Sequence, residues 1–135
     1  ETSAPAGTTE QRLREALALW RGPALEGMGH LGPVTSGIEQ RLGEERAVVQ
    51  LRLIDLLLAG GRYDDVLPEL RELSVAHPVD ERYQERLMRA LSLSGRQTEA
   101  VDVYHLVREE LRRTYGLEPG PLLRRRLSLV LRQEV

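Results

Sequence analysis

Residues 53–62, LIDLLLAGGR, and residues 87–96, LMRALSLSGR, decide the fold of this chain, because they repeat one pattern at a shift of 34 positions. The shift aligns apolar residues with apolar residues and aligns Gly61-Arg62 with Gly95-Arg96. The match continues beyond the glycines, where Leu70 corresponds to Tyr104. A chance alignment of leucines does not explain the paired Gly-Arg turns, so the two segments are predicted to be structural repeats.

A period of 34 residues is typical of a tetratricopeptide unit, which is a helix, a tight turn and an antiparallel helix. One such hairpin cannot bury its apolar side alone, and neighbouring hairpins therefore stack. Apolar residues recur at helical spacing along the chain, and no segment alternates with the period of a strand. The sequence predicts an all-α fold of antiparallel helical hairpins stacked as a tetratricopeptide-like superhelix. About six helices are expected, over residues 8–20, 36–59, 65–76, 80–93, 97–115 and from 121 onward.

Several residues predict where these helices begin and end. Ser36 with Glu39 forms a capping box at the start of the long second helix. Asp65 is predicted to cap the third helix, which would place Pro68 at its third position, where no intrahelical amide bond is lost. Gly116 is expected to end the fifth helix in a left-handed conformation, and Pro121 to open the last one.

Length and composition exclude several classes of protein. The chain has 135 residues, enough for one ordinary domain, and it contains no cysteine and no lysine. A disulfide framework, a thiolate metal site and a Schiff-base lysine are therefore excluded. The stretch from Thr2 to Gly7, TSAPAG, has the composition of a flexible linker, so residues 1–8 are expected to be a linker, followed by one domain over residues 9–135. With no apolar run of membrane length and no leader pattern, a cytoplasmic location is expected.

The sequence predicts no catalytic, metal or cofactor site. His30, His77 and His105 lie far apart and have no metal-ligand spacing. The paired carboxylates, such as Asp64-Asp65, are neighbours on a helix and point about 100° apart, so they do not form an acid–base couple. The chain is therefore not expected to be an enzyme.

Two charged surfaces are candidates for partner contacts. If the first helix of each hairpin lines a concave groove, the charged residues facing it are Asp55, Arg82, Glu85 and Arg89. Residues 108–135 form the second candidate, with seven arginines against four glutamates. This excess of positive charge suits an acidic partner surface or phosphates. Both sets also fit charged helix faces that only contact solvent.

In addition, one ordered series of motifs resembles the bacterial transcriptional activation domain of the Streptomyces antibiotic regulatory proteins. It opens with the segment from Ala16 to Leu25, ALALWRGPAL, and ends with the segment from Tyr115 to Pro119, YGLEP. The resemblance covers essentially residues 9 to 132. Between these ends it includes Arg41-Leu42, Glu45-Arg46, Gly61-Arg62-Tyr63, His77-Pro78, Glu81-Arg82, Leu87-Met88, Ser94-Gly95-Arg96-Gln97 and Tyr104.

The resemblance implies a module that supports dimerisation and RNA polymerase recruitment in activators of secondary-metabolite genes. Its expected partners are protein: a second copy, RNA polymerase, or the DNA-binding winged helix of the same polypeptide. That winged helix is not in this chain, so no direct contact with nucleic acid is expected. Within the motifs, Trp20 is expected to anchor the first helix on the second, Gly61 and Gly95 to permit the turns, and Tyr104 to face inward. The alternative is a tetratricopeptide-type adaptor or ligand-sensing module of an unrelated regulator or enzyme.

Overall fold

The structure is a computed structural model that describes residues 10–15 and 33–133. The chain divides into two compact units, Glu1–Leu56 and Leu57–Val135. Trp20, His30 and the predicted linker over residues 1–8 lie outside the described residues. All regular structure in the described residues is helical, which confirms the predicted all-α class.

In the first unit, residues 10–15 are helical and the helix α3 spans Pro33–Ala59, ending just inside the second unit. The predicted start of this helix at Ser36 was wrong by three residues. Proline is favoured at the first helical position, where its fixed φ suits the helix and its missing N–H is no loss. The side chains of Leu51, Leu53 and Ile54 are buried.

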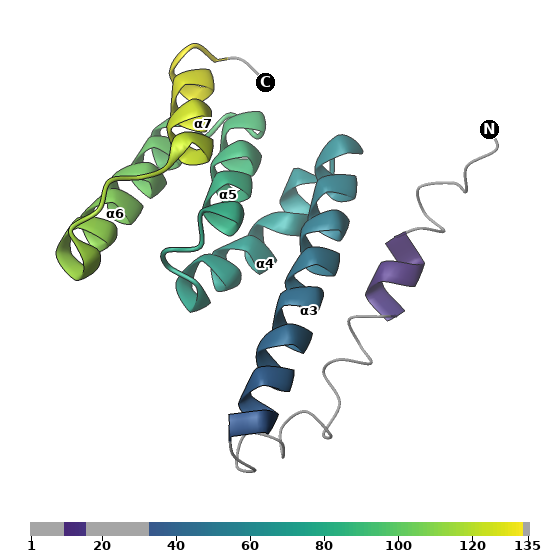
Figure 1. Cartoon of the computed structure of the whole chain (residues 1–135). Coiled ribbons are helices and arrows are strands. Elements are labelled where there is room, and N and C mark those ends of the chain that lie inside the picture. Colours follow the sequence, from purple (N-terminus) through teal and green to yellow (C-terminus); the bar gives the residue numbers. More distant parts are fainter. Residues whose placement is uncertain (1–9, 16–32, 134–135) are drawn as a thin grey trace. The chain divides into compact units, whose positions relative to one another are not determined.

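The second unit contains α4 (Tyr63–Ala76), α5 (Glu81–Leu93), α6 (Gln97–Tyr115) and α7 (Pro121–Leu131). Figure 1 shows α5 between α4 on one side and α7 on the other, and α5 contacts α4, α6 and α7. The most buried side chains come from all four helices, so one apolar core joins them. They include Val66, Leu70, Tyr83, Met88, Leu91, Ala100, Leu123 and Val130, each no more than 1% exposed.

The two repeated turns have the same backbone geometry. Gly61 and Gly95 adopt φ of 77° and 86°, in the left-handed region. In the first turn the N–H of Arg62 donates to the carbonyl of Leu57, and in the second the N–H of Arg96 donates to the carbonyl of Leu91. The side chains following each glycine also match, since Arg62 pairs with Asp65 and Arg96 with Glu99. The 34-residue repeat of the sequence is thus a repeat of hydrogen bonds.

Replacing Gly61 or Gly95 by alanine is expected to lower the free energy of unfolding by about 1–2 kcal/mol, because a side chain disfavours the left-handed conformation. A Cβ at either position meets no atom within 4 Å, so the cost is one of backbone conformation alone. Urea unfolding of the chain measures it. Gly43→Ala is the matched control: Gly43 is helical, lacks the positive φ and also has open space. That variant is expected to be neutral or slightly more stable, and equal losses at all three glycines would contradict the explanation.

The start of α4 differs from the prediction. The helix begins at Tyr63 with Arg62 as its N-cap residue, and Asp65 lies in its first turn, where the carboxylate accepts a hydrogen bond from Arg62 Nε at 2.8 Å. Pro68 is therefore inside the helix and not at its third position. Pro68 is exposed, so water can hydrogen-bond the backbone carbonyl that the proline ring leaves without an amide partner.

Candidate protein-interaction surface

Part of the α5 face that was predicted to line a groove is covered by α7. Glu85 on α5 has a side chain only 2% exposed. One of its carboxylate oxygens accepts a hydrogen bond from Arg126 Nε of α7 at 2.8 Å, and the same carboxylate accepts bonds from Arg89 at 2.8 and 2.9 Å. Arg86 lies 3.6 Å from it. One buried carboxylate thus binds arginines from two helices, and it holds α7 against α5.

A second carboxylate fixes the beginning of α7. Glu81, one turn before Glu85 on α5, accepts a hydrogen bond from the N–H of Gly120 at 2.9 Å. Gly120 is the N-cap residue of α7, so Glu81 satisfies an amide just before the helix that the helix itself cannot pair. A Cβ at Gly120 would lie 3.2 Å from the same carboxylate, so glycine permits this close approach.

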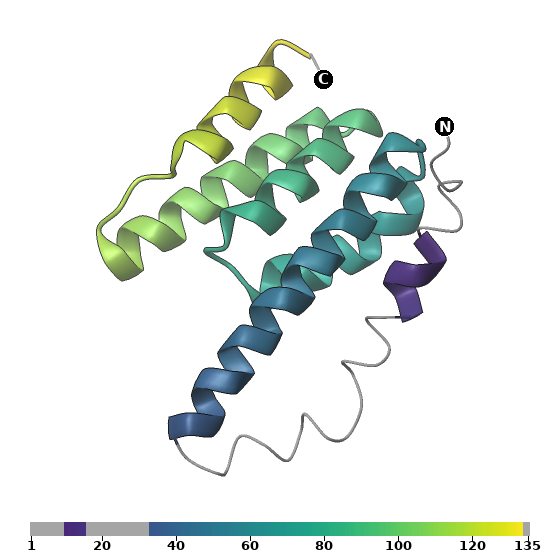
Figure 2. The same cartoon turned by 45° about the vertical axis from the view of Figure 1, so that its right-hand side comes forward.

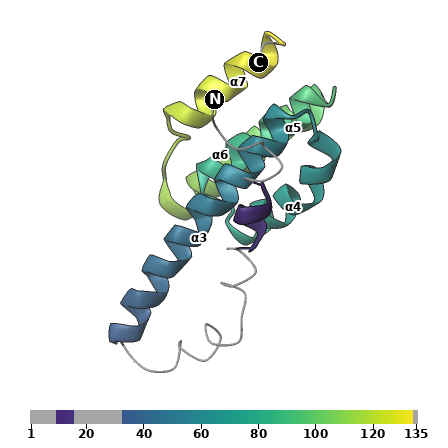
Figure 3. The ribbon, with the colours of Figure 1, turned by 90° about the vertical axis from the view of Figure 1, so that its right-hand side faces the viewer.

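The segment between α6 and α7, residues 116–120, connects the two helices (Figure 3), and hydrogen bonds and ion pairs attach it to α6. Gly116 is left-handed with φ of 68°, as predicted, and ends α6. Glu118 then pairs with Arg108 at 3.0 Å and with Arg112 at 2.9 Å. These hydrogen bonds, first from Arg112 and then from Arg108, lower the pKa of Glu118 and keep the carboxylate charged. The segment therefore places the start of α7 in a defined position.

Arg82 is paired at the beginning of α5. Its guanidinium binds Asp80 at 2.8 Å, while Asp80 also accepts the backbone N–H of Arg82 at 3.1 Å and so caps the helix. The hydrogen bonds and charge of Arg82 lower the pKa of Asp80 against the opposing effect of its partial burial. A carboxyl with a lowered pKa stabilises the fold above its unfolded-state pKa, and this contribution is lost as the pH falls through the folded-state value.

Asp55 lies in the other unit, apart from the three predicted groove residues of α5. With Leu13, Arg52 and Leu56 it lines a cavity of about 340 Å³. The four predicted partner-binding residues are therefore three on α5 and one in a separate compact unit. Of the three on α5, Glu85 is buried and Arg89 is bonded to it, whereas Arg82 keeps 36% of its side chain exposed.

Within α5, α7 covers Glu85, one of the predicted groove residues, and sequence reasoning did not find the residues that cover it. Glu81, Gly120 and Arg126 were seen only as parts of motifs or of an arginine run. The signal available was the spacing of Glu81, Glu85 and Arg89, which recur every four residues and so share one face of a helix. Two acidic residues and one basic residue on one side of a helix can bind a basic helix of the same chain or another protein. That α7 is the basic helix follows only from the tertiary fold.

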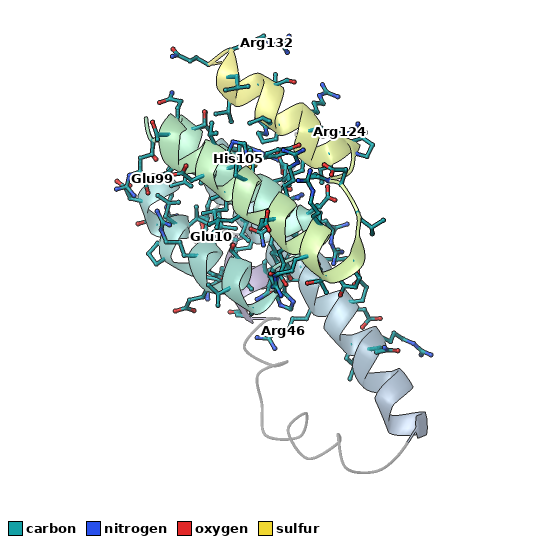
Figure 4. The ribbon with its side chains drawn as sticks, turned by 90° about the vertical axis from the view of Figure 1, so that its left-hand side faces the viewer. Glu10, Arg46, Glu99, His105, Arg124 and Arg132 are labelled. Carbon is teal, nitrogen blue, oxygen red and sulfur yellow. The ribbon has the colours of Figure 1, made fainter. Side chains whose placement is uncertain are left out.

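The histidines give no sign of metal binding in the part of the chain that the structure describes. His77 stacks on Tyr83 with ring centroids 4.9 Å apart, and His105, labelled in Figure 4 on α6, meets the edge of Tyr104. No group of three metal-ligating side chains occurs among residues 10–15 and 33–133. In the same residues no helix is long and apolar enough to cross a membrane.

These features define a helical-hairpin repeat module whose charged α5 face is partly covered by α7. The chain belongs to the family of the bacterial transcriptional activator domain, which matches residues 2–131. It is 38% identical over 122 residues to the regulatory protein AfsR of Streptomyces coelicolor, covering 90% of this chain and 12% of that protein. It is 36% identical to the transcriptional regulator RedD of the same organism, covering 90% of this chain and 35% of RedD. The chain thus spans well under half of these relatives.

A solved structure supports the fold assignment. The structure of Mycobacterium tuberculosis EmbR in complex with a low-affinity phosphopeptide matches with a TM-score of 0.86 and 31% identity. The match covers 93% of this chain and 33% of that one. The predicted tetratricopeptide-like helical fold and the predicted resemblance to antibiotic regulatory proteins are both confirmed.

Proposed function

We propose that residues 9–135 are the protein-interaction and oligomerisation module of a transcriptional activator of secondary-metabolite genes. In this role the module supports dimerisation and recruits RNA polymerase. The proposal is supported chiefly by the family match over residues 2–131, because the matched relatives are named as transcriptional regulators. Stacked helical hairpins suit it, since they present long side-chain faces to other proteins.

The module is proposed to act in the cytoplasm by binding and not by catalysis. Its partners are a second copy, RNA polymerase, or the DNA-binding domain of the same polypeptide, and residues 1–8 serve as a linker. It needs no cofactor and makes no direct contact with nucleic acid.

The four predicted partner-binding residues have two proposed roles. Asp55 and Arg82 are proposed to contact partners directly; Arg82 keeps its guanidinium partly exposed beside Asp80. Glu85 and Arg89 are proposed to act indirectly, because they hold α7 in place and so shape the surface that a partner meets.

Binding of the purified chain to purified RNA polymerase tests this function. RNA polymerase from Streptomyces coelicolor, the source of two relatives, is passed over immobilised chain, with promoter DNA as a separate probe. Polymerase is expected to bind and DNA is not, at roughly physiological salt. Arg82→Glu is expected to weaken polymerase binding about tenfold. Arg12→Glu is the matched control, since it makes the same charge change at an exposed residue of the other unit.

Two outcomes contradict the proposed function. One is selective retention of operator DNA by the chain, which would assign it a direct role in reading DNA. The other is an absence of polymerase binding together with an absence of self-association.

A further inference from the structure

Almost every arginine of the second unit pairs with a carboxylate, and the exceptions lie on α7. Pairs involve the arginines from Arg62 to Arg113, for example Arg71 with Glu99 at 2.9 Å and Arg108 with Glu118 at 3.0 Å. Arg124 and Arg125 are exposed, and no carboxylate of the described residues pairs with either. The helix itself has no acidic residue. Unneutralised positive charge is therefore concentrated on this helix.

The contact between Arg126 and Glu85 sets which face of α7 points outward. Arg126, Leu123 and Val130 are turned toward α5 and α6, and the exposed positions of the helix, among them Arg124, Arg125 and Ser128, form its outer side. Figure 4 shows Arg124 near the start of α7 and Arg132 near its end. Leu122 and Leu131 on the helix are 44% and 64% exposed. Arg124 and Arg125 lie on the outer half of the helix, with Leu122 at one edge and Leu131 at the other, and these four residues are called the α7 face.

A surface of opposite charge lies on α4. Asp64, Pro68, Glu72 and Val75 are exposed and recur at three- or four-residue spacing, so they share one side of the helix. Val75 is 81% exposed, and no arginine of the described residues pairs with Asp64 or Glu72. These four residues are called the α4 face.

The two faces lie on opposite sides of the same unit. In Figures 1 and 2, α4 and α7 lie on opposite sides of α5, and both helices pack against α5. Each face combines two unpaired charges with exposed apolar side chains, which is the combination that protein surfaces use for specific association. The leucines of the α7 face favour a protein over a phosphate backbone, whose contacts are polar.

We propose that the α7 face of one copy docks on the α4 face of a second copy, head to tail. This inference rests on the proposed function, because it names the surface for self-association. Because the two faces differ, the contact is heterologous and leaves a free face at each end, so association can continue beyond a dimer. Helices of 11 and 14 residues bury less than the roughly 800 Å² per partner of a stable complex, so the isolated chain associates weakly.

Sedimentation of the purified chain at increasing concentration, up to about 1 mM, tests the contact. The mean mass is expected to rise with concentration and to fall when salt is raised from about 50 mM to about 500 mM. R124E/R125E is expected to weaken association at least about tenfold, and D64R/E72R to do the same. E72R alone serves as a second variant, because Asp64 lies in the first turn of α4, where replacing it also weakens the helix.

Mixing the two double variants gives the sharpest result. Neither associates with itself, but the intact α4 face of R124E/R125E meets the intact α7 face of D64R/E72R, so the mixture is expected to associate. The control variants are R12E/R41E and D102R/E109R, which make the same charge changes at exposed residues elsewhere and are expected to match the unaltered chain.

Three results overturn the inference: a monomer at all concentrations, association that the double variants leave unchanged, or a mixture that stays dissociated. Association through another face would reject the contact between the α7 and α4 faces but would agree with the proposed function. A chain that is monomeric at all concentrations and still retains polymerase would also reject the contact and agree with the proposed function.

Discussion

Glu85→Ala is expected to lower the free energy of unfolding by about 3–5 kcal/mol, the loss typical of removing one partner of a buried ion pair. The carboxylate is 2% exposed and accepts hydrogen bonds from Arg89 and Arg126. Without it, Arg126, whose side chain is only 12% exposed, loses the carboxylate acceptor 2.8 Å from its Nε while most of the side chain stays shielded from water. Urea unfolding followed by circular dichroism measures the loss.

Two further variants test whether the loss comes from the buried ion pair of Glu85 or from removing any glutamate. Glu109→Ala removes an exposed glutamate of α6 and is expected to change stability by less than about 0.5 kcal/mol. The double variant Glu85→Met with Arg126→Met replaces the pair by apolar side chains and is expected to regain most of the loss. A loss below about 1 kcal/mol for Glu85→Ala would show that Glu85 does not hold α7.

Leu123→Ala is expected to cost about 2–5 kcal/mol, as for other fully buried leucines. Leu123 is 0% exposed on α7, so its removal leaves a cavity in the core of the second unit. The adjacent residue provides the matched control, since Leu122 is 44% exposed and Leu122→Ala is expected to cost less than about 1 kcal/mol. Thermal or urea unfolding of the two variants compares them directly, and similar losses would show that α7 is not docked as described.

Local signals predicted most of the helix boundaries. Helix α5 begins within one residue of the predicted position 80, α6 ends at Gly116 and α7 opens at Pro121, because caps and proline act within one turn of the residue. The start of α4 was wrong because Asp65 bonds the side chain of Arg62 and does not cap the helix. In the sequence, an aspartate that caps a helix cannot be distinguished from one that lies in its first turn and bonds a side chain. Only the backbone conformation distinguishes the two roles.

The contacts of the charged residues on α5 could be predicted only in part from helical spacing. Spacing along the helix predicts that Arg82, Glu85 and Arg89 share one side of α5, but it does not predict what covers that side. Whether Glu85 meets solvent or Arg126 depends on α7, some 40 residues further along the chain. Contacts between two helices depend on how the helices stack, and the spacing of residues along one helix contains no information about that.

The hydrogen bond between Glu81 and Gly120 has a consequence for the order of folding. Helices α4, α5 and α6 are consecutive and contact their neighbours through short connections, so these hairpins close small loops. The surface that receives α7 is made by α5 and α6 together, and it exists only once that hairpin has formed. Helix α7 is therefore expected to dock after that hairpin has formed, and during synthesis from the N-terminus α5 and α6 precede it.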